Sequence, residues 1–298
     1  MATGTVRGAE AMGRVEPVAS VEDRQAPAQP VRPMRIGVLV VAYNAIQTLG
    51  ATLDRFPAGV MDKIEEIFVF DDHSTDRTYE AALEYKRRRG LGKLRIFRNE
   101  RNRRYGGNQK QGYRYALERG FDVVVLLHGD GQYAPEVMQG LLDPLERDEA
   151  EMVMGSRMMP GGNPLKGGMP SYKFVGNKVL SMVENWVLGT RFFEFHSGYR
   201  AYSCRALAQV PFERCTDEWH FDTQIIIQFL ARRFRIVERP IPTYYGSEIC
   251  YVNGLAYAVH CAESVLRYRL HRWGWIREPL FDVTDSGRPL PAQAGTAQ

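Results

Sequence analysis

Short apolar segments alternate with longer segments of helical spacing along the first half of the chain. The apolar segments, rich in Val, Ile and Leu, are residues 34–42, 64–70, 94–98 and 123–127. Segments with helical spacing follow them at residues 48–56, 77–89, 106–119 and 135–150. Continuous apolar runs of this length are typical of strands buried on both faces. The alternation therefore predicts an α/β fold with a mainly parallel sheet and helices on both of its faces.

The pattern changes after residue 157. Residues 158–170 contain four glycines and three prolines, which indicates a long loop. Loops of this length in compact domains are typically lids or binding loops, with a plain surface excursion as the alternative. Beyond the loop we predict helices at 171–188, 220–232 and 252–275, a strand and turn at 192–202, and a short strand at 235–238.

The last predicted helix, residues 252–275, has an uneven character. One side of it is apolar and carries Leu255, Ala258, Val259, Ala262, Val265 and Leu266. Its end, residues 267–275, mixes arginines with Tyr and Trp, a combination that suits the headgroup level of an anionic membrane. A terminal helix packed on the domain, with a solvated basic face, is the alternative interpretation.

These patterns divide the chain into four parts. Residues 1–33 show no periodicity and are rich in Ala, Pro, Gly, Arg and Glu, so they predict a disordered leader. Residues 34–250 form the folded domain, and residues 251–282 form a C-terminal amphipathic helical extension. Residues 283–298 predict a flexible tail.

Composition narrows the classes of function. The net charge of +4, from 39 basic and 35 acidic residues, is too small to indicate a nucleic-acid partner. The four cysteines are scattered without a Cys-x-x-Cys pair, so we expect reduced thiols rather than disulfides or a zinc site. No apolar run of 18 residues predicts a transmembrane helix, and the N-terminus lacks the apolar core of a secretory signal. We expect a cytoplasmic protein, either free or peripherally bound at the inner face of the membrane.

Polar clusters follow the first, second and fourth predicted strands at the point where each strand ends. They are Tyr43-Asn44, Asp71-Asp72 and the segment 128–132, His-Gly-Asp-Gly-Gln. The carboxyl ends of parallel strands meet at one edge of a sheet, where ligands bind in open α/β folds. We therefore expect the three clusters to converge on one site. A solvated turn is the alternative for residues 128–132, because Gly and Asp are common in turns.

Asp71, Asp72 and Asp130 suit a nucleotide and its metal ion. Carboxylates accept hydrogen bonds from ribose hydroxyls and from a base N–H, and together with diphosphate oxygens they hold Mg²⁺ or Mn²⁺. Such a metal neutralises the charge on a departing nucleoside diphosphate. Arg157 offers a further cation for the diphosphate. Helix capping is the alternative role for Asp71 or Asp72, although polar residues from position 74 on are better placed for it.

The motifs at these positions resemble family 2 glycosyltransferases, which have the GT-A fold with its Rossmann-like nucleotide-binding sheet. The resemblance is carried by Val41-Ala42-Tyr43-Asn44, by Asp71-Asp72-His73-Ser74-Thr75-Asp76, and by Asn102 with Gly106-Gly107-Asn108. Later segments resemble the branch of dolichol- or polyprenol-phosphate sugar synthases: residues 153–157, Ser197-Gly198-Tyr199-Arg200, Phe221-Asp222 and residues 235–241. Together these motifs extend from about residue 35 to about residue 245.

The resemblance implies roles for individual residues. The donor nucleotide would be held by Ala42, Tyr43, Asn44, Asp71, Asp72 and Asn108. Asp130 would bind the diphosphate and a divalent metal, Mg²⁺ or Mn²⁺, with Gln132 close to the sugar. Arg157 and Arg200 would contact the diphosphate or the acceptor phosphate. The family carries Asp-x-Asp here, and His128 replaces the first Asp as a ligand better suited to softer transition metals than to Mg²⁺.

The activity implied by the resemblance is inverting transfer of a sugar from a UDP- or GDP-linked donor to a polyprenyl phosphate. Transfer to a hydroxyl of a glycan or small molecule is an alternative, in which Asp222 or Asp217 is the candidate general base. The other interpretation of Asp222 is a charge that complements its helix dipole. A non-catalytic homologue that binds nucleotide sugars is the alternative of another class. Gln224 stands where the branch often has Glu, and the C-terminus lacks the transmembrane helices of many members.

Overall fold

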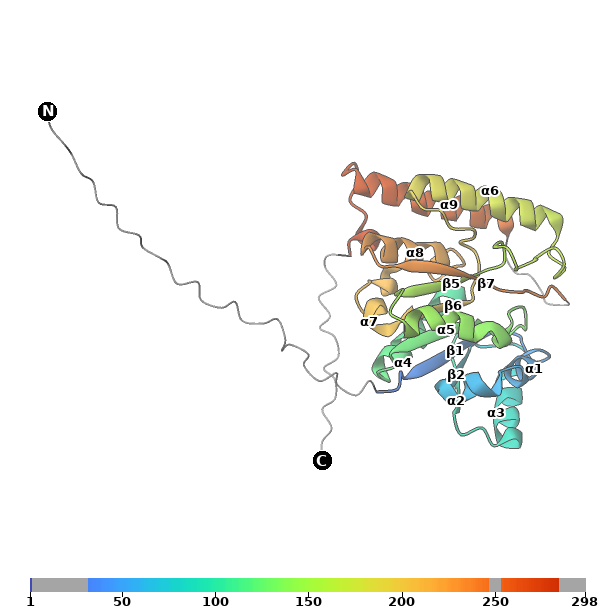
Figure 1. Cartoon of the computed structure of the whole chain (residues 1–298). Coiled ribbons are helices and arrows are strands. Elements are labelled where there is room, and N and C mark those ends of the chain that lie inside the picture. The colour runs from blue at the N-terminus through green and yellow to red at the C-terminus, as the bar shows by residue number, and fades with distance from the viewer. Residues whose placement is uncertain (2–31, 247–252, 284–298) are drawn as a thin grey trace. The chain divides into compact units, whose positions relative to one another are not determined.

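The structure is a computed structural model of the whole chain (Figure 1). It describes residues 1, 32–246 and 253–283. Most of the predicted leader, Cys250 and the predicted tail from residue 284 lie outside the described residues. The described residues from Met34 onward belong to one compact unit.

Within the described residues, seven strands form one sheet in the order β3-β2-β1-β4-β6-β5-β7. The sheet is mainly parallel, as predicted, but β6 runs antiparallel to both β4 and β5. The strands are β1 (Ile36–Ala42), β2 (Ile64–Asp71), β3 (Leu94–Arg98), β4 (Val123–His128), β5 (Met152–Ser156), β6 (Arg200–Ser203) and β7 (Ile236–Pro240).

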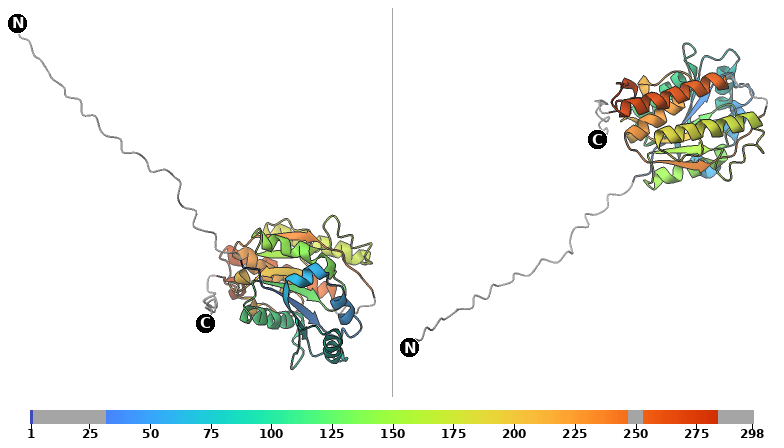
Figure 2. Two further views of the ribbon diagram at one scale, coloured as in Figure 1. Left: turned by 60° about the horizontal axis from the view of Figure 1, so that its bottom comes forward. Right: turned by 90° about the horizontal axis from the view of Figure 1, so that it is seen from above.

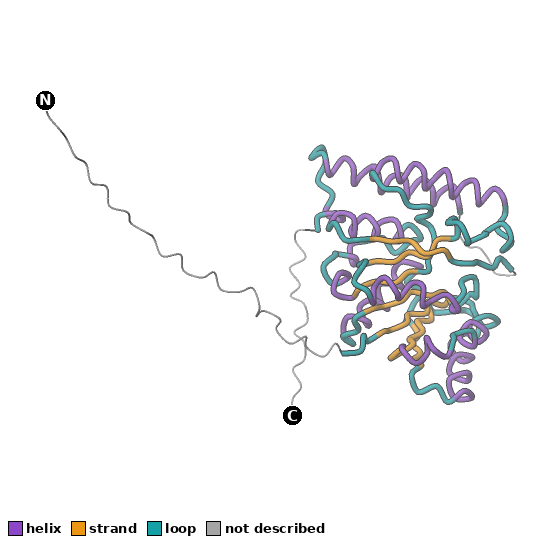
Figure 3. The backbone as a smooth tube through the Cα atoms, in the orientation of Figure 1, coloured by secondary structure: helices purple, strands orange, loops and turns teal. Residues whose placement is uncertain are grey.

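Helices cover the sheet on both faces (Figure 3). The α-helices are α1 (Leu49–Asp54), α2 (Ala58–Lys63), α3 (Thr78–Arg89), α4 (Arg104–Glu118), α5 (Met138–Glu146), α6 (Ser171–Leu188), α7 (Cys204–Leu207), α8 (Phe221–Ala231) and α9 (Gly254–Arg272). Short 3₁₀ helices are η1 (Pro135–Val137), η2 (Phe212–Arg214) and η3 (Pro279–Phe281). Among the described helices, none combines the length and hydropathy needed to span a bilayer.

Some predicted bounds were wrong in detail. The predicted helix 135–150 is η1 followed by α5, and it ends before Asp148, whose φ of +52° is left-handed. Only the end of the predicted strand 192–202 pairs in the sheet, as β6. Helices α2 and α7 were not predicted, because segments of six and four residues are too short to show helical periodicity.

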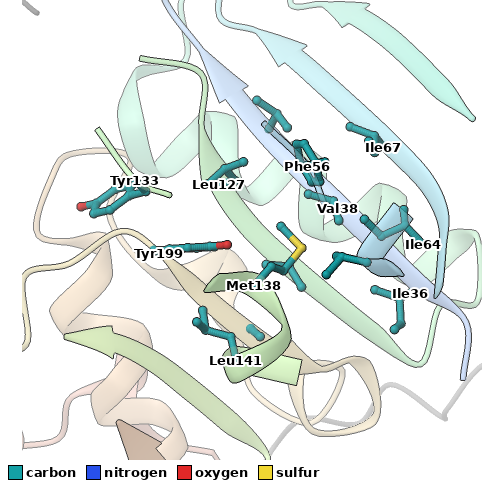
Figure 4. Close-up of a cluster of buried hydrophobic side chains, with 14 of the residues drawn as sticks. Ile36, Val38, Phe56, Ile64, Ile67, Leu127, Tyr133, Met138, Leu141 and Tyr199 are labelled. Atoms are coloured by element: carbon teal, nitrogen blue, oxygen red, sulfur yellow. The ribbon is translucent and has the colours of Figure 1, made fainter. Parts of the chain in front are cut away.

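Alternate side chains of the central strands pack into separate cores on the two faces of the sheet. Val38 of β1 lies in the core under α1, α2, α3 and α5, whereas its neighbour Leu39 lies in the core under α4 and α8. Figure 4 shows the first core, in which Leu127 of β4 lies near Tyr133 and Tyr199. Burial on both faces fixes the register of β1 and β4, and with it the position of their carboxyl ends.

Helices α6 and α9 lie side by side and form an outer layer against α8 (Figures 1 and 2). Val265 and Tyr268 of α9 pack with Ile227 of α8 and with Phe281. The side of α9 that the sequence analysis grouped as apolar is therefore only partly buried. Its members Leu255, Val259 and Leu266 are exposed.

Candidate active site

The structure brings the three polar clusters together at the carboxyl edge of the sheet. In the parallel register, Ala42 of β1 pairs with Asp71 of β2, and Val41 pairs with His128 of β4. The backbone N–H of Asp72 donates to the carbonyl of Ala42 at 2.8 Å, which continues the pairing beyond the strands. The convergence follows from parallel pairing of buried strands.

The carboxylates of Asp71 and Asp72 are buried and hydrogen-bonded within the protein. Asp71 accepts hydrogen bonds from the backbone N–H and the hydroxyl of Ser74. Asp72 accepts from the side-chain amide of Asn99 at 2.7 Å and from the backbone N–H of Arg103 at 2.8 Å. Burial raises the pKa of both carboxyls above the ordinary value, although these hydrogen bonds act in the opposite direction. The pair anchors the loops after β2 and β3.

Asn44 and Asn108 connect the same loops. The side-chain oxygen of Asn44 accepts from the backbone N–H of Thr75 at 2.9 Å, and Asn44 itself has a left-handed φ of +51°. Asn108 of α4 is buried, donating to the carbonyl of Phe70 at 3.0 Å and accepting from Asn99 at 2.9 Å. Of the residues predicted to hold the nucleotide, Tyr43 has the most exposed side chain, at 38%. It offers an aromatic surface beside the buried acids.

Asp130 lies directly beyond the end of β4 and presents a carboxylate to solvent. Its side chain is 38% exposed, and its Oδ1 accepts from the backbone N–H of Gln132 at 3.0 Å. Its Oδ2 lies 3.9 Å from Nδ1 of His128. Burial lowers the pKa of the His128 ring, although the neighbouring Asp130 acts in the opposite direction, so the ring is neutral at pH 7.

Tyr105, in the first turn of α4, joins His128 to Asp222. Its hydroxyl donates to Oδ2 of Asp222 at 2.8 Å and lies 3.2 Å from Nε2 of His128. Trp219 stacks on the Tyr105 ring, with 4.5 Å between ring centroids. A continuous polar chain therefore runs from Asp130 through His128 and Tyr105 to Asp222.

This chain determines the tautomer of His128. The hydroxyl of Tyr105 has one hydrogen, which it donates in a hydrogen bond to the Asp222 carboxylate. Its oxygen can therefore only accept a hydrogen bond from His128. The proton of the neutral His128 ring therefore lies on Nε2. Its Nδ1 then carries a lone pair on the side of Asp130. One nitrogen and one carboxylate oxygen are available together at the end of β4.

Asp222 and Arg200 form a buried ion pair, with 3.3 Å between Arg200 Nη1 and Asp222 Oδ1. Arg200 is fully buried and also donates to the backbone carbonyls of Phe195, Ser197 and Asp222. Its predicted contact with a phosphate stays a prediction. What the structure shows is a guanidinium that fixes the segment before β6 to the start of α8.

Arg157, at the end of β5, is also buried and paired. It forms an ion pair with the buried Glu194, and its Nη2 donates to the carbonyl of His196 at 3.0 Å. Its Nη1 donates to the hydroxyl of Tyr245 at 2.9 Å. Burial acts to raise the pKa of Glu194, but Arg157 lowers this pKa below its ordinary value, so the Glu194 carboxyl stays ionised. Both predicted arginines therefore hold the segment 194–200.

The remaining predicted residues lie around this centre. Asp217 is exposed and forms an ion pair with Lys110 at 2.7 Å. Gln224 is buried and accepts from the backbone N–H of Thr216 at 2.7 Å. Both side chains hold the segment that precedes α8.

An open pocket of about 670 Å³ lies between the loop 158–170 and α6, immediately after Arg157. Its lining is mainly apolar, with two cationic side chains, Lys166 and Lys178. The apolar lining residues include Met158, Met159, Pro164, Leu165, Phe174 and Phe193. The predicted loop therefore forms a wall of a pocket.

Sequence analysis missed Tyr105 and Glu194. The sequence held one local signal for Tyr105, namely the glycine that follows it. A Cβ at Gly106 would lie 2.4 Å from the carbonyl oxygen of Thr216, so only glycine fits at that position. Because glycine allows two backbone segments to approach closely, the residue next to such a glycine lies where the two segments meet. Glu194 gave no local signal, because it meets Arg157 across 37 residues.

Comparisons with known proteins concern the family and the fold of the chain. Residues 37–210 match the model of glycosyl transferase family 2. The chain is 30% identical over 210 residues to the undecaprenyl-phosphate mannosyltransferase of Micrococcus luteus, covering 70% of this chain and 83% of that protein. It is 29% identical over 221 residues to the UDP-N-acetylglucosamine–dolichyl-phosphate N-acetylglucosaminyltransferase of Methanococcus voltae, covering 70% and 86%.

The fold also resembles that of a solved enzyme. The structure of glucosyl-3-phosphoglycerate synthase from Mycobacterium tuberculosis, in complex with Mn²⁺, UDP-glucose and phosphoglyceric acid, superposes with a TM-score of 0.57. The match covers 81% of this chain and 80% of that chain, at 18% sequence identity.

The assignment of the His128 tautomer is testable without substrate. Long-range ¹H–¹⁵N NMR of the ring should show a proton on Nε2 and none on Nδ1 at pH 7. Tyr105→Phe removes the hydroxyl acceptor and should abolish this preference. Tyr115→Phe is the matched control, because Tyr115 lies on the same helix and its hydroxyl donates to Glu66 instead. An Nδ1-protonated ring in the unmodified protein would contradict the assignment.

Proposed function

Because the chain belongs to glycosyl transferase family 2, we propose that it transfers a sugar from a UDP- or GDP-linked donor to the phosphate of a polyprenyl phosphate. The observation that carries the acceptor class is the pocket between α6 and the loop that follows Arg157 in the sequence. An apolar lining suits an isoprenoid chain, and Lys166 and Lys178 suit its phosphate. The relatives from Micrococcus luteus and Methanococcus voltae are named for acceptors of this class.

The reaction requires no proton removal from the acceptor. A phosphate monoester carries a charge of about −1.5 to −2 at pH 7. Its oxygen forms a bond to the anomeric carbon while the bond from that carbon to the diphosphate oxygen breaks. The nucleoside diphosphate leaves with the bonding electrons, and the anomeric configuration inverts.

The contacts of Asp222 favour this acceptor over a hydroxyl. A hydroxyl acceptor needs a base with a free carboxylate oxygen within about 2.6–3.2 Å of its proton. Asp222 is buried, and its carboxylate oxygens contact Tyr105 and Arg200. Asp217 is already paired with Lys110. We assign Asp222 the role of positioning Tyr105, and thereby His128, rather than that of general base.

The residues at the end of β4 fit a divalent metal ion. Asp130 supplies an exposed carboxylate, and His128 supplies a neutral ring with its Nδ1 lone pair on the same side. A mixed nitrogen and oxygen pair suits Mn²⁺ better than Mg²⁺, which prefers oxygen ligands alone. When bound, the metal would neutralise charge on the leaving diphosphate. Tyr105 would keep the ring oriented for this role, as partners of a metal-bound His do.

Helix α6 suggests how the protein reaches an acceptor that is dissolved in a membrane. Its side toward the protein contains the polar residues Asn177, Ser181 and Glu184, and apolar packing is added near its end by Val187 and Leu188. Its exposed side is apolar and contains Tyr172, Val175, Val179, Met182 and Trp186. This arrangement reverses the usual pattern of a surface helix. We define these exposed side chains, together with Leu255, Val259, Leu266, Trp273 and Trp275, as the apolar face.

We propose that the apolar face docks on the surface of an anionic membrane. Trp186 is 83% exposed and Leu255 79% exposed, which is unfavourable in water unless another surface covers them. Arg269 and Lys178 accompany the face as cations, each lying over an aromatic ring. Aromatic and basic residues together favour the headgroup level of a bilayer.

The first test is a transfer assay with a panel of UDP- and GDP-sugars and polyprenyl phosphate in detergent. We expect sugar in the lipid phase with at least one donor, and a loss of at least about 100-fold in rate for Asp130→Ala. Asp62→Ala is the control, because Asp62 is exposed on α2, before the amino end of β2. Transfer only to hydroxyl acceptors, or nucleotide binding without turnover, would contradict the proposal.

The second test measures binding to vesicles that contain phosphatidylglycerol. Replacing Val179, Met182 and Trp186 together with serine should reduce partitioning at least about tenfold, because each apolar side chain contributes about 1 kcal/mol or more when buried. Leu83→Ser is the control, since Leu83 is an exposed apolar residue on α3. Equal partitioning of the triple variant and the unmodified protein would show that this face does not contact the membrane.

A further inference from the structure

Three chemically reactive side chains meet in the interior beneath the outer layer. They are Glu184 from α6, His196 from the segment before β6, and Cys261 from α9. One ligand atom from each lies within 4.8 Å of the other two. None of them takes part in the polar chain from Asp130 to Asp222 described above.

Two atoms of this cluster are buried without a hydrogen-bond partner. Nε2 of His196 and Oε2 of Glu184 lie 3.1 Å apart, an ion-pair distance if the ring is protonated, and among the described residues neither atom makes a hydrogen bond. The Glu184 side chain is fully buried, and that of His196 is 6% exposed. Leaving a buried polar atom unsatisfied costs about 1–3 kcal/mol, and more for a charged group. A proton or a metal ion between these two atoms would satisfy both of them.

The outer contacts of the cluster match those of a metal-binding histidine. The hydroxyl of Tyr257 lies 2.9 Å from Nδ1 of His196. If Nε2 binds a metal, the proton stays on Nδ1, and Nδ1–H donates a hydrogen bond to the Tyr257 hydroxyl. The hydroxyl of Thr223 lies 3.1 Å from Oε1 of Glu184 and 3.3 Å from Sγ of Cys261. Such partners fix the tautomer of a ligating histidine and the orientation of the other ligands.

We propose that Glu184, His196 and Cys261 bind one divalent transition-metal ion, with Zn²⁺ the best match. A thiolate, an imidazole nitrogen and a carboxylate oxygen are the three ligand types that Zn²⁺ takes in proteins, at about 2.0–2.3 Å. A tetrahedral ion at those bond lengths separates its ligand atoms by about 3.3–3.7 Å. The 3.1 Å separation of His196 and Glu184 is close to this range. Three protein ligands leave the fourth position to a water molecule.

This site is separate from the donor metal site. The ligand set contains a soft thiolate, whereas the end of β4 offers Asp130 and His128 without sulfur. Binding would deprotonate the Cys261 thiol and release its proton to solvent. The sequence analysis did not expect zinc, because the ligands are separated by 12 and 65 residues and form no Cys-x-x-Cys pair.

A proton is the competing occupant of the space between Glu184 and His196. Burial lowers the pKa of His196, but the Glu184 carboxylate and the Cys261 side chain together outweigh burial and raise the pKa to about 10. Without metal, the ring would therefore be an imidazolium paired with a carboxylate at pH 8. In that arrangement Cys261 is a neighbour of the ion pair, whereas a metal ion would bind all three side chains. The two occupants are distinguishable by direct measurement.

The bound ion would fasten the outer layer to the rest of the protein. Its ligands join α6, α9 and the segment 194–200. Arg157 and Arg200 fix this segment by donating hydrogen bonds to its backbone carbonyls. Metal-binding free energy at such a site contributes to folding stability. Removal of the metal should therefore lower the thermal unfolding midpoint and loosen the packing of α9 on α8.

The test measures metal content in the full chain expressed with added zinc and dialysed against a weak chelator. We expect about one Zn²⁺ per chain, and after Co²⁺ exchange a thiolate-to-cobalt charge-transfer band in the near ultraviolet. Both should be lost in Cys261→Ser and retained in Cys215→Ser, since Cys215 is an equally buried free thiol elsewhere. Both should also persist in Asp130→Ala, which excludes the donor site as the source.

A further variant protects the test against misfolding. Cys261→His keeps a ligand at that position and should retain stoichiometric metal while losing the charge-transfer band. Less than about 0.2 equivalents of Zn²⁺ in the folded, zinc-supplemented protein would overturn the proposal. A His196 ring that NMR shows to be doubly protonated at pH 8 under the same conditions would overturn it equally.

Discussion

The buried ion pair between Arg200 and Asp222 holds the candidate active site together. Arg200 donates to three backbone carbonyls and forms an ion pair with the Asp222 carboxylate, so one guanidinium joins β6, the segment before it and the start of α8. Asp222 in turn holds the hydroxyl of Tyr105, and Tyr105 orients His128 at the end of β4. Breaking such a pair leaves an uncompensated buried charge, so each later contact depends on it.

The same arrangement explains how a histidine can stand where the family carries an aspartate. His128 is neutral because it is buried, and its Nε2 is occupied by Tyr105, so it presents one lone pair next to Asp130. Histidine in place of aspartate removes one negative charge from the end of β4 and replaces a candidate oxygen ligand with nitrogen. On the proposed function, a metal bound there would still neutralise charge on the diphosphate, and we expect the preferred metal to shift from Mg²⁺ towards Mn²⁺.

Local patterns were enough to predict β1 to β4, the convergence of strand ends at Asp71 and Asp130, and the full length of α6, but not β5. That helix ends at Gly189, whose left-handed φ of +73° stops it where the sequence suggests. Contacts between distant segments were not predictable, because periodicity carries no information about them. The reversal of β6, the pairing of Arg157 with Glu194 and the outward direction of the apolar side of α6 all belong to this class.

The central claim is that Asp130 and His128 together hold the metal of the donor diphosphate. Pulsed electron paramagnetic resonance of Mn²⁺ bound with UDP or GDP tests it most directly, because coupling to ¹⁴N reports a coordinated imidazole. The account predicts imidazole ¹⁴N coupling in the unmodified protein, its absence in His128→Asp, and a loss of Mn²⁺–nucleotide binding in Asp130→Ala. Nucleotide-dependent Mn²⁺ binding without ¹⁴N coupling, or unchanged in Asp130→Ala, would contradict it.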